Sequence, residues 1–318
     1  MMSAENATTR SLILGCMGMG GTWDQNPVTL ADETKAASAL DAALESGITT
    51  FDHADIYSFG KAETVFGRLL ATRPSLRQSI HIQSKTGVSL NAGVNGDTHY
   101  DLSRKYIVDQ TLAILKRLQT DYLDTLLLHR PDPLMEGEEI AAAFEWLHTR
   151  GLVRFFGVSN MHLKHIRYIT GQSHFPIVAN QLQFSLGHRL LIESDILVNQ
   201  AGVAPTASTD GLLAYCHDQE VVLQAWSPLD KGKYLQTDAE DATTLATILK
   251  VKEMAGRYQV PPEAILLAWL FAMPARVVPV VGTLNPSRIK ACAMSLNVKL
   301  SRTDWYDLWI TARGISLP

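Results

Sequence analysis

The feature of this sequence that most constrains its fold is a regular alternation between short apolar runs and longer amphipathic segments. The short runs are rich in β-branched residues, and the segments between them have the 3.6-residue spacing of helices. Strands that are apolar on both faces are typical of a parallel sheet covered by helices. We place eight such strands at residues 12–15, 48–54, 80–84, 122–129, 154–159, 177–182, 221–227 and 277–282.

The length of the chain allows either two domains or one large one, because 318 residues exceed the ~100–200 residues of a typical domain. No Pro- or Ser-rich linker divides the chain, and the alternation continues throughout. The pattern therefore predicts an α/β fold, a (β/α)8 TIM barrel that forms a single domain over residues 1–318. We expect helices at 32–46, with Asp32 as the N-cap, at 103–118 and at 137–149, and a long insertion at about 187–210.

The composition excludes several classes of partner. Only 19% of the residues are charged, the formal net charge is −4, and no cluster of Lys and Arg marks a nucleic-acid or membrane surface. The three cysteines have unrelated spacings, so we expect them to stay reduced. The first residues lack the pattern of a signal peptide, and no run reaches the ~18 apolar residues of a membrane span. We expect a cytoplasmic protein, a monomer or weak homo-oligomer that binds neither nucleic acid nor membrane.

Polar residues close the otherwise apolar runs, once in each strand-and-helix unit. Catalytic residues of barrel enzymes lie where the strands end, so we expect these side chains to surround a single mouth. Burying Asp, Lys and His there without mutual pairing would cost several kcal/mol, which makes chance placement a poor explanation. The residues are Asp52, Lys85, His129, Ser159 with Asn160, Gln181, Trp226 with Ser227, and Gly282 with Thr283.

Four of the residues in this region suit the delivery of a proton to a developing alkoxide. Tyr57 follows the second strand, and a lysine beside it would lower its pKa from ~10. Lys85 can supply that charge, and Asp52 would hold the lysine in place. His129 could donate to a substrate oxygen as a neutral imidazole. Asp52, Tyr57, Lys85 and His129 are therefore our candidate catalytic set.

Three other interpretations of this part of the sequence remain open. The GCMGMGG stretch could be a dinucleotide-binding loop, although that motif needs a helix directly after it. A hydrolase metal site could use His53, Asp55, His129 and Asp132, although adjacent strand residues face opposite ways. Lys85 could instead form a Schiff base, as in barrel aldolases. An aldolase has no need of Trp226, Asn160 and Gln181, whereas a nicotinamide cofactor would use them.

Seven motifs in order along the chain resemble those of the aldo-keto reductases, from the first strand to Arg288. They are FDHADIY, SKTG, LLLHRPDP, FFGVSN, NQLQFS, AWSPL and VVGTLNPSRI. The likeness is greatest to bacterial reductases with DHADIY and HRPDP, in which His follows the Asp. The resemblance implies a barrel that binds NADPH in extended form and passes hydride to an aldehyde or ketone carbon, without a metal.

Carried over by residue, the resemblance makes Tyr57 the general acid, Lys85 and Asp52 its partners, and His129 the orienting donor. It further implies that Ser159, Asn160 and Gln181 hold the nicotinamide carboxamide, with Trp226 stacked on the ring. Along the rest of the cofactor, it implies that Ser227, Pro228 and Leu229 line the pyrophosphate path and that Gly282, Thr283 and Arg288 receive the adenosine end.

Two departures from the family pattern affect these assignments. Many members have Lys where Gly282 stands, so one phosphate-binding charge is missing and NADH remains a possible cofactor. The first-strand motif aligns either at residues 15–17 or at residues 21–23. A strand that ends near Gly15 favours the former, which places Gly15 and Met17 at the cofactor and Trp23 in the substrate pocket. A non-catalytic, cofactor-sensing regulatory subunit is a further alternative, although all four catalytic residues are present.

Overall fold

The fold is a closed barrel of eight parallel strands, seen in a computed structural model that describes residues 10–90, 97–197 and 211–318. The order around the barrel is β1, β10, β9, β8, β7, β6, β3, β2. The (β/α)8 prediction is confirmed, and each predicted run overlaps a strand. The barrel strands are β1 (Ile13–Gly15), β2 (Thr50–Asp52), β3 (His81–Thr86), β6 (Leu123–Leu128), β7 (Val153–Ser159), β8 (Ile177–Gln183), β9 (Val222–Trp226) and β10 (Val277–Val281).

Two compact units can be distinguished within the chain. The larger contains Ile13–Gln181 and Gly282–Pro286, and the smaller contains Met1–Leu12, Leu182–Val281 and Ser287–Pro318. That residues 1–318 form a single domain therefore stays a prediction.

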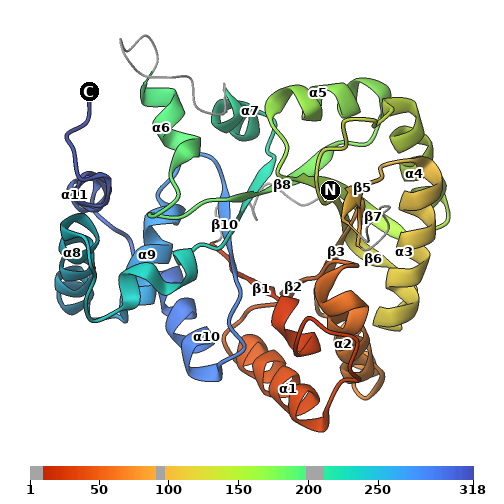
Figure 1. Cartoon of the computed structure of the whole chain (residues 1–318), viewed down its shortest axis with the longest axis horizontal. Coiled ribbons are helices and arrows are strands. Elements are labelled where there is room, and N and C mark those ends of the chain that lie inside the picture. The colour runs from red at the N-terminus through yellow and green to blue at the C-terminus, as the bar shows by residue number, and fades with distance from the viewer. Residues whose placement is uncertain (1–9, 91–96, 198–210) are drawn as a thin grey trace. The chain divides into compact units, whose positions relative to one another are not determined.

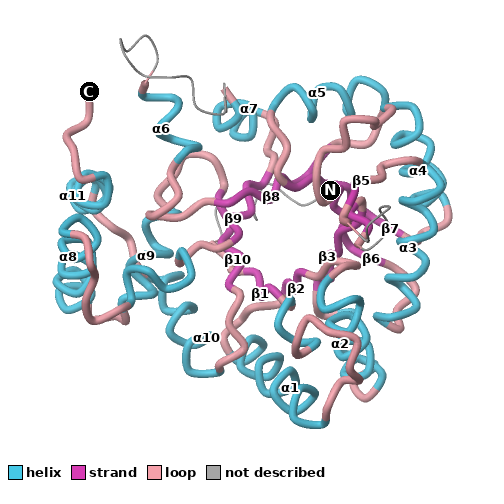
Figure 2. Tube along the Cα trace, viewed as in Figure 1, coloured by secondary structure: helices cyan, strands magenta, loops and turns pink. Residues whose placement is uncertain are grey.

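Helices cover the strands of the larger unit on their outer side (Figure 1). Consecutive helices pack side by side, α2 on α3, α3 on α4 and α4 on α5, and Figure 2 shows them outside the strands β3, β6 and β7. Most residues of these strands are buried, as expected of a parallel sheet, and the exceptions include Arg154 and Phe155 near the start of β7, which are exposed. The helices are α1 (Leu30–Glu45), α2 (Lys61–Ala71), α3 (Arg104–Leu118), α4 (Gly137–Thr149) and α5 (Leu163–Gln172).

Helix α1 begins two residues before the predicted start, and its cap is not the one expected. Thr29 is the N-cap: its hydroxyl accepts a hydrogen bond from the backbone N–H of Asp32, whose side chain accepts one from Thr29 in return. This reciprocal arrangement is a capping box, in which an acidic residue at the third helical position takes part. The prediction that Asp32 is the N-cap is therefore wrong, because Asp32 is the partner of the cap.

Pairing of the strands determines which polar side chains meet at the carboxyl ends. Asp52 at the end of β2 lies in register with Gln83 of β3, and Ser159 of β7 with Gln181 of β8. His129 follows the last residue of β6 directly. Because all the strands run in parallel, these residues lie at the same end of the barrel.

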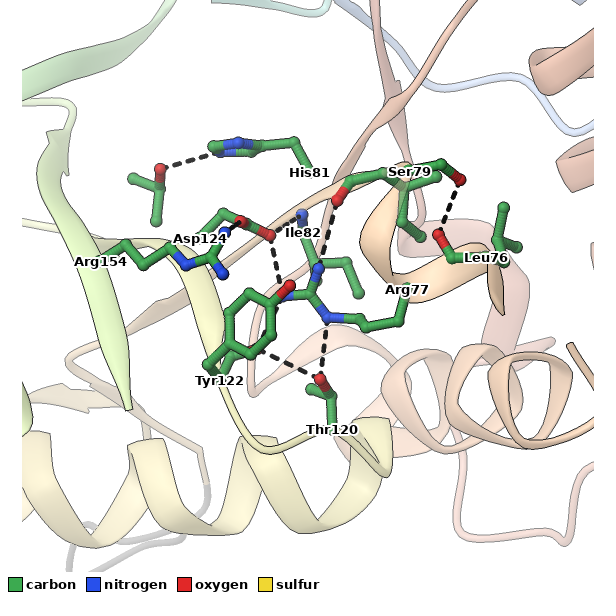
Figure 3. Close-up of polar contacts among 11 residues, drawn as sticks. Leu76, Arg77, Ser79, His81, Ile82, Thr120, Tyr122, Asp124 and Arg154 are labelled. Carbon is green, nitrogen blue, oxygen red and sulfur yellow. Dashed lines mark hydrogen bonds and ion pairs between the residues drawn. The ribbon is translucent and has the colours of Figure 1, made fainter. Parts of the chain in front are cut away.

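The opposite ends of the strands carry a separate polar cluster, shown in Figure 3. Asp124, near the start of β6, accepts hydrogen bonds from Arg77 (2.8 Å), from Arg154 at the start of β7 (3.0 Å) and from the backbone N–H of Ile82 (2.9 Å). The ring of Tyr122 lies against both guanidinium groups, 3.7 Å from that of Arg77 and 3.9 Å from that of Arg154. This cluster joins the starts of β3, β6 and β7.

In the smaller unit, α8 and α11 pack side by side (Figure 1). Trp269 of α9 and Trp305 of α11 stack with ring centroids 5.2 Å apart, and each indole N–H donates to the other's backbone carbonyl. The N–H groups of the buried Trp269 indole and of the half-buried Trp305 indole both have acceptors as a result. The helices of this unit are α6 (Leu190–Ile196), α7 (Leu212–Asp218), α8 (Ala242–Tyr258), α9 (Pro262–Phe271), α11 (Arg302–Arg313) and most of α10 (Pro286–Ala293).

Other expectations have mixed outcomes. All three cysteines are free, as predicted, and the structure shows that all three are buried. The insertion expected at about 187–210 contains α6, but residues 198–210 lie outside the described part of the chain. The short antiparallel pair β4 (Val88–Ser89) and β5 (His99–Tyr100) after β3 was not predicted. Within the residues that are described, no helix is long and apolar enough to cross a membrane.

Candidate active site

The centre of the candidate site is the ammonium group of Lys85, which is fully buried near the end of β3. Its nitrogen donates to Oδ2 of Asp52 (2.7 Å), to the backbone carbonyl of His53 (2.9 Å) and to the hydroxyl oxygen of Tyr57 (3.0 Å). An ammonium group has three protons, so each is used. The structure thus brings together Asp52, Lys85 and Tyr57, three of the four predicted catalytic residues, through direct contacts.

Two glutamine side chains complete the surroundings of Asp52. Its Oδ1 accepts from Nε2 of Gln83 (2.6 Å) and from Nε2 of Gln181 (3.0 Å), and all three residues are buried. Gln83 is a residue that the sequence analysis missed. It could have been found from the two-residue period of a strand, because Gln83 and Lys85 lie on the same face of β3.

Burial opposes the positive charge on Lys85, but Asp52 and Tyr57 beside it outweigh this effect and raise the pKa of the amine above its ordinary value. Lys85 is therefore an ammonium at neutral pH. Burial also dominates at Tyr57 and raises the pKa of its phenol, although Lys85 acts in the opposite direction. The expected depression of the Tyr57 pKa is wrong for this site, because desolvation of the phenolate exceeds the stabilisation from one ammonium that Asp52 already neutralises.

His129 stands beside Tyr57, with ring centroids 6.2 Å apart and the planes nearly perpendicular. Burial lowers the pKa of His129 well below its ordinary value, and the charge on Lys85 lowers it further. The imidazole is thus neutral, as the sequence predicted. Its Nδ1 is buried, with no hydrogen-bond partner among the described residues.

Ser159, Asn160 and Gln181 form a neutral hydrogen-bonding group where β7 and β8 end. The backbone carbonyl of Gln181 accepts from the Ser159 hydroxyl (2.9 Å) and from the Asn160 backbone N–H (2.9 Å). Asn160 has a left-handed backbone, with φ of 58°, and its side-chain nitrogen donates to the Ser159 hydroxyl (2.8 Å). Hydroxyl and amide groups without charge fit a carboxamide, which itself offers one acceptor and one donor group. The donor chemistry of this group of residues therefore suits a nicotinamide.

Gly15, at the end of β1, lies in register with Asp52, and Met17 is half exposed in the turn that follows. The next segment carries Trp23, which is 47% exposed and packs edge to face on Phe59 with ring centroids 6.0 Å apart. Asp24 anchors this segment because it accepts from Lys61 (3.0 Å). The exposed aromatic pair is thus tied to the segment that contains Tyr57.

Trp226, Ser227, Pro228, Leu229 and Arg288 belong to the smaller unit, so the structure does not place them against the residues above. Trp226 ends β9 and is half-buried. Ser227 adopts a left-handed backbone with φ of 53°, and its carbonyl accepts from the N–H of Asp230 (2.9 Å). Arg288 is exposed in the first turn of α10.

Gly282 and Thr283 follow β10 and belong to the larger unit. The Thr283 hydroxyl accepts from the backbone N–H of Asn285 (3.2 Å). A Cβ atom added to Gly282 would meet nothing within 4 Å. Steric crowding therefore does not require glycine at this position.

The geometry bears on the three alternative chemistries. Across the described ranges, no group of three or more His, Cys, Asp and Glu side chains is placed to hold a metal ion. A Schiff base needs a neutral amine, whereas Lys85 is held as an ammonium by three acceptors. The first α-helix begins only at Leu30, so no helix follows the GCMGMGG stretch directly. Each observation counts against the corresponding interpretation.

Comparisons with known proteins identify the family of the chain. The pattern of the Aldo/keto reductase family matches residues 11–309. Oxidoreductase YcsN of Bacillus subtilis, itself uncharacterized, is 34% identical over 304 residues, covering 94% of each chain. The 6-dehydroglucose reductase of Agrobacterium fabrum is 32% identical over 306 residues, covering 95% of this chain and 94% of its own.

A similar solved structure is that of the thermostable aldo-keto reductase Tm1743 in complex with the inhibitor epalrestat. It has a TM-score of 0.74 and 26% identity, and the match covers 94% of each chain. The barrel and the match to the family pattern define an oxidoreductase of the (β/α)8 class. The chain belongs to the aldo/keto reductase family and is an enzyme that reduces carbonyl compounds.

Proposed function

We propose that the chain reduces a small aldehyde or ketone to an alcohol with NADPH as the hydride donor and Tyr57 as the general acid. The observation that carries the proposal is the Lys85 ammonium, which contacts Asp52 and Tyr57 at 2.7 and 3.0 Å. This contact fixes the phenol at the strand ends and puts a positive charge beside the oxygen that would lose a proton. Such preorganised charge stabilises an anion that forms during the reaction.

Tyr57 would give its proton to the carbonyl oxygen of the substrate as that oxygen becomes an alkoxide. Its raised pKa keeps the phenol protonated at neutral pH, which is the form that an acid needs. Lys85 stabilises the phenolate that remains, and Asp52 balances the lysine when no phenolate is present. Reprotonation of Tyr57 from solvent would restore the site for the next turnover.

His129 would orient the same carbonyl oxygen. In a neutral imidazole one ring nitrogen carries the proton and the other is an acceptor. Because Nδ1 is buried without a partner in the described chain, the proton is better placed on Nε2, where an acceptor from the substrate can reach it. The oxygen would then receive hydrogen bonds from both Tyr57 and His129.

The cofactor, when bound, supplies the hydride, and NADPH is our choice over NADH. Ser159, Asn160 and Gln181 would hold the carboxamide, and Trp226 would stack on the ring. Ser227, Pro228 and Leu229 would line the pyrophosphate path, with Gly15 and Met17 on the side of β1. Thr283 and the guanidinium of Arg288 would receive a 2′-phosphate beside Gly282, because arginine binds phosphate with two parallel hydrogen bonds.

The substrate would enter beside Trp23. This side chain and Phe59 expose an aromatic surface within the segments that flank Tyr57. An apolar wall with a few polar anchors is common in sites for small molecules. We propose a small carbonyl compound as substrate. A cytoplasmic location and a monomeric or weakly homo-oligomeric state remain proposals. Sedimentation of the purified protein would test the oligomeric state.

The proposal is tested with Tyr57→Phe, which removes the hydroxyl and leaves the ring. Wild-type protein is assayed against a panel of carbonyl compounds that includes 6-dehydroglucose, with NADPH and NADH in parallel, by loss of reduced-nicotinamide absorbance. The variant should lose turnover by at least ~100-fold, the lower range for general acid catalysis. NADPH should still quench its tryptophan fluorescence as in the wild type. Unchanged turnover would reject Tyr57 as the acid.

Two other functions would give results that distinguish them from the reductase. A Schiff-base aldolase would form a stable adduct on Lys85 when borohydride is added with a carbonyl substrate, and we expect none. A cofactor-sensing regulatory subunit would bind NADPH but reduce no member of the panel. The pairing of Lys85 with Tyr57 favours the reductase over both.

A further inference from the structure

We propose that Gln83 is a positioning residue that lets Gln181 release Asp52 and bind the cofactor. In this arrangement, Gln83 keeps the Asp52 carboxylate hydrogen-bonded while the side-chain amide of Gln181 turns toward the nicotinamide carboxamide. The inference rests on the function proposed above, because it requires that Gln181 contacts the cofactor.

The starting observation is that two amide donors share a single oxygen. Gln83 and Gln181 both donate to Oδ1 of Asp52, at 2.6 and 3.0 Å, whereas Oδ2 is the acceptor for Lys85. The contact with Gln83 is the shorter of the two. Gln83 also lies in backbone register with Asp52 on the neighbouring strand, so its position does not depend on the side chain of Gln181.

Gln181 is well placed to exchange partners. Its backbone carbonyl is held by the hydroxyl of Ser159 and the N–H of Asn160, so the main chain is fixed while the side chain can rotate about its own bonds. Nε2 of Gln181 thus connects the Asp52 carboxylate to the neutral group that suits a carboxamide. A cofactor that recruits this amide competes with Asp52 for it.

Without Gln83, that competition would leave a buried anion poorly satisfied. Asp52 is 1% exposed, so water cannot readily replace a lost donor. If Gln181 turned away and Gln83 were absent, Oδ1 of Asp52 would lose both of the amide donors seen in the described part of the chain. A buried carboxylate oxygen without a donor is costly, so Gln181 would stay on Asp52 and cofactor binding would weaken.

The chemistry of Gln83 also matters. A neutral donor completes the carboxylate without adding a charge, so the Asp52–Lys85 pair stays balanced and the ammonium beside Tyr57 is preserved. A second lysine at the same place would compete with Lys85 for Asp52. An amide is therefore the donor that supports the exchange without disturbing the charge next to Tyr57.

The test is a double-mutant cycle on NADPH binding, which does not require turnover. Gln83→Met and Gln181→Met remove each amide and keep a flexible side chain of similar length. Dissociation constants come from quenching of tryptophan fluorescence for the wild type, both single variants and the double variant. Thermal unfolding of the cofactor-free proteins shows whether each variant is folded.

We expect Gln83→Met to weaken NADPH binding about 10-fold in the presence of Gln181, as for one hydrogen bond to a charged group. In the Gln181→Met background, the same change should weaken binding less than about 2-fold, because no amide is left to be released. Equal weakening in both backgrounds would overturn the inference, since a merely structural role of Gln83 affects both alike. No weakening in either background would overturn it as well.

A measurement on the wild type serves where Gln83→Met does not fold. In protein labelled with ¹⁵N-glutamine, NADPH should shift the side-chain amide signals of Gln181 by more than those of Gln83. The signals are assigned by their loss in Gln181→Met. A larger shift at Gln83 would overturn the inference. If the wild type binds NADPH but the effects of the two substitutions are additive, only this inference is rejected. If the wild type binds no nicotinamide cofactor and reduces no carbonyl compound, the proposed function is rejected too.

Discussion

The Lys85 ammonium lies 3.0 Å from the Tyr57 hydroxyl oxygen, yet the pKa of that phenol is above its ordinary value. Burial disfavours the phenolate more than one lysine favours it, and Asp52 neutralises the same lysine. The lysine therefore does not create a phenolate in the resting site. Its effect is on the reaction, where it stabilises the charge that Tyr57 acquires on giving up its proton.

The pH dependence of turnover follows from these directions. Because the pKa of Tyr57 is raised and that of His129 is lowered, the acid stays protonated and the histidine neutral between ~pH 6 and ~pH 10. We expect kcat for carbonyl reduction to be flat across this range, with no step near the ordinary histidine pKa of ~6.5. Loss of the acid form should appear only in more alkaline solution.

The control for this profile is Asp55→Asn. Burial raises the pKa of Asp55 to about 7, so a step there could come from this carboxyl rather than from His129. A step in the profile that disappears in Asp55→Asn comes from Asp55 and does not contradict the roles proposed for Tyr57 and His129. A step near pH ~6.5 that persists in the variant would show that His129 titrates in the working range.

The barrel could be predicted because eight strands that are apolar on both faces allow few other arrangements. The positions of Asp52, Lys85 and His129 at strand ends were also predicted correctly. The sequence analysis missed the net direction of the Tyr57 pKa, since the balance between burial and one charge depends on three-dimensional packing. Gln83 was missed for a different reason: it precedes the strand end. The two-residue period of a strand places it on the same face as Lys85, but its contact with Asp52 depends on the register of β2 and β3. Cap assignment failed at Asp32 because either end of a capping box can be taken for the cap.

Arg288 gives a prediction about cofactor choice. If its guanidinium holds the 2′-phosphate, Arg288→Ala should weaken NADPH binding by about 10- to 100-fold and NADH binding far less, since only NADPH has this group. Binding is measured by fluorescence titration with both cofactors. Lys290→Ala, an exposed cation in the same helix, is the matched control and should change neither constant appreciably. Equal losses for NADPH and NADH in Arg288→Ala would show that this residue does not discriminate.

Gly282 allows the converse change. A Cβ at this position would meet nothing within 4 Å, and Gly282 is exposed, so the site can accept a residue with a side chain. Gly282→Lys should supply the charge that many family members have here and raise the preference for NADPH over NADH by about 5- to 10-fold. Gly282→Met, of similar length without charge, is the control. A similar gain with methionine would mean that charge is not the cause.

Asp55 should make the stability of the fold depend on pH. It is buried near Thr86 of β3, Glu63 of α2, and Arg117 and Tyr106 of α3. Its pKa of about 7 lies above the unfolded value, so the folded state binds the extra proton, and stability falls as pH rises through this range. Relative to wild type, Asp55→Asn should gain up to about 3 kcal/mol in unfolding free energy between ~pH 5 and ~pH 8.

Urea unfolding at the two pH values measures this gain. His53 affects stability with the opposite sign, because burial lowers its pKa to about 3. The folded state therefore loses stability as the pH falls below the ordinary histidine pKa. His53 is present in both proteins, so the comparison at each pH cancels its effect. The same difference between wild type and variant at both pH values would contradict the assignment to Asp55.

The Asp124 cluster should act on stability alone. Its carboxylate, 8% exposed, accepts from Arg77 and Arg154 at the strand starts, whereas the candidate site lies at the strand ends. Asp124→Ala leaves the mostly buried Arg77 without its carboxylate partner and should cost about 3 kcal/mol of unfolding free energy. Arg154→Ala removes a side chain that is 55% exposed and should cost less than about 1 kcal/mol. Urea unfolding measures both, and kcat and KM of the folded variants should equal those of the wild type. A fall in kcat in Asp124→Ala at full folding would show that the two ends of the barrel are coupled.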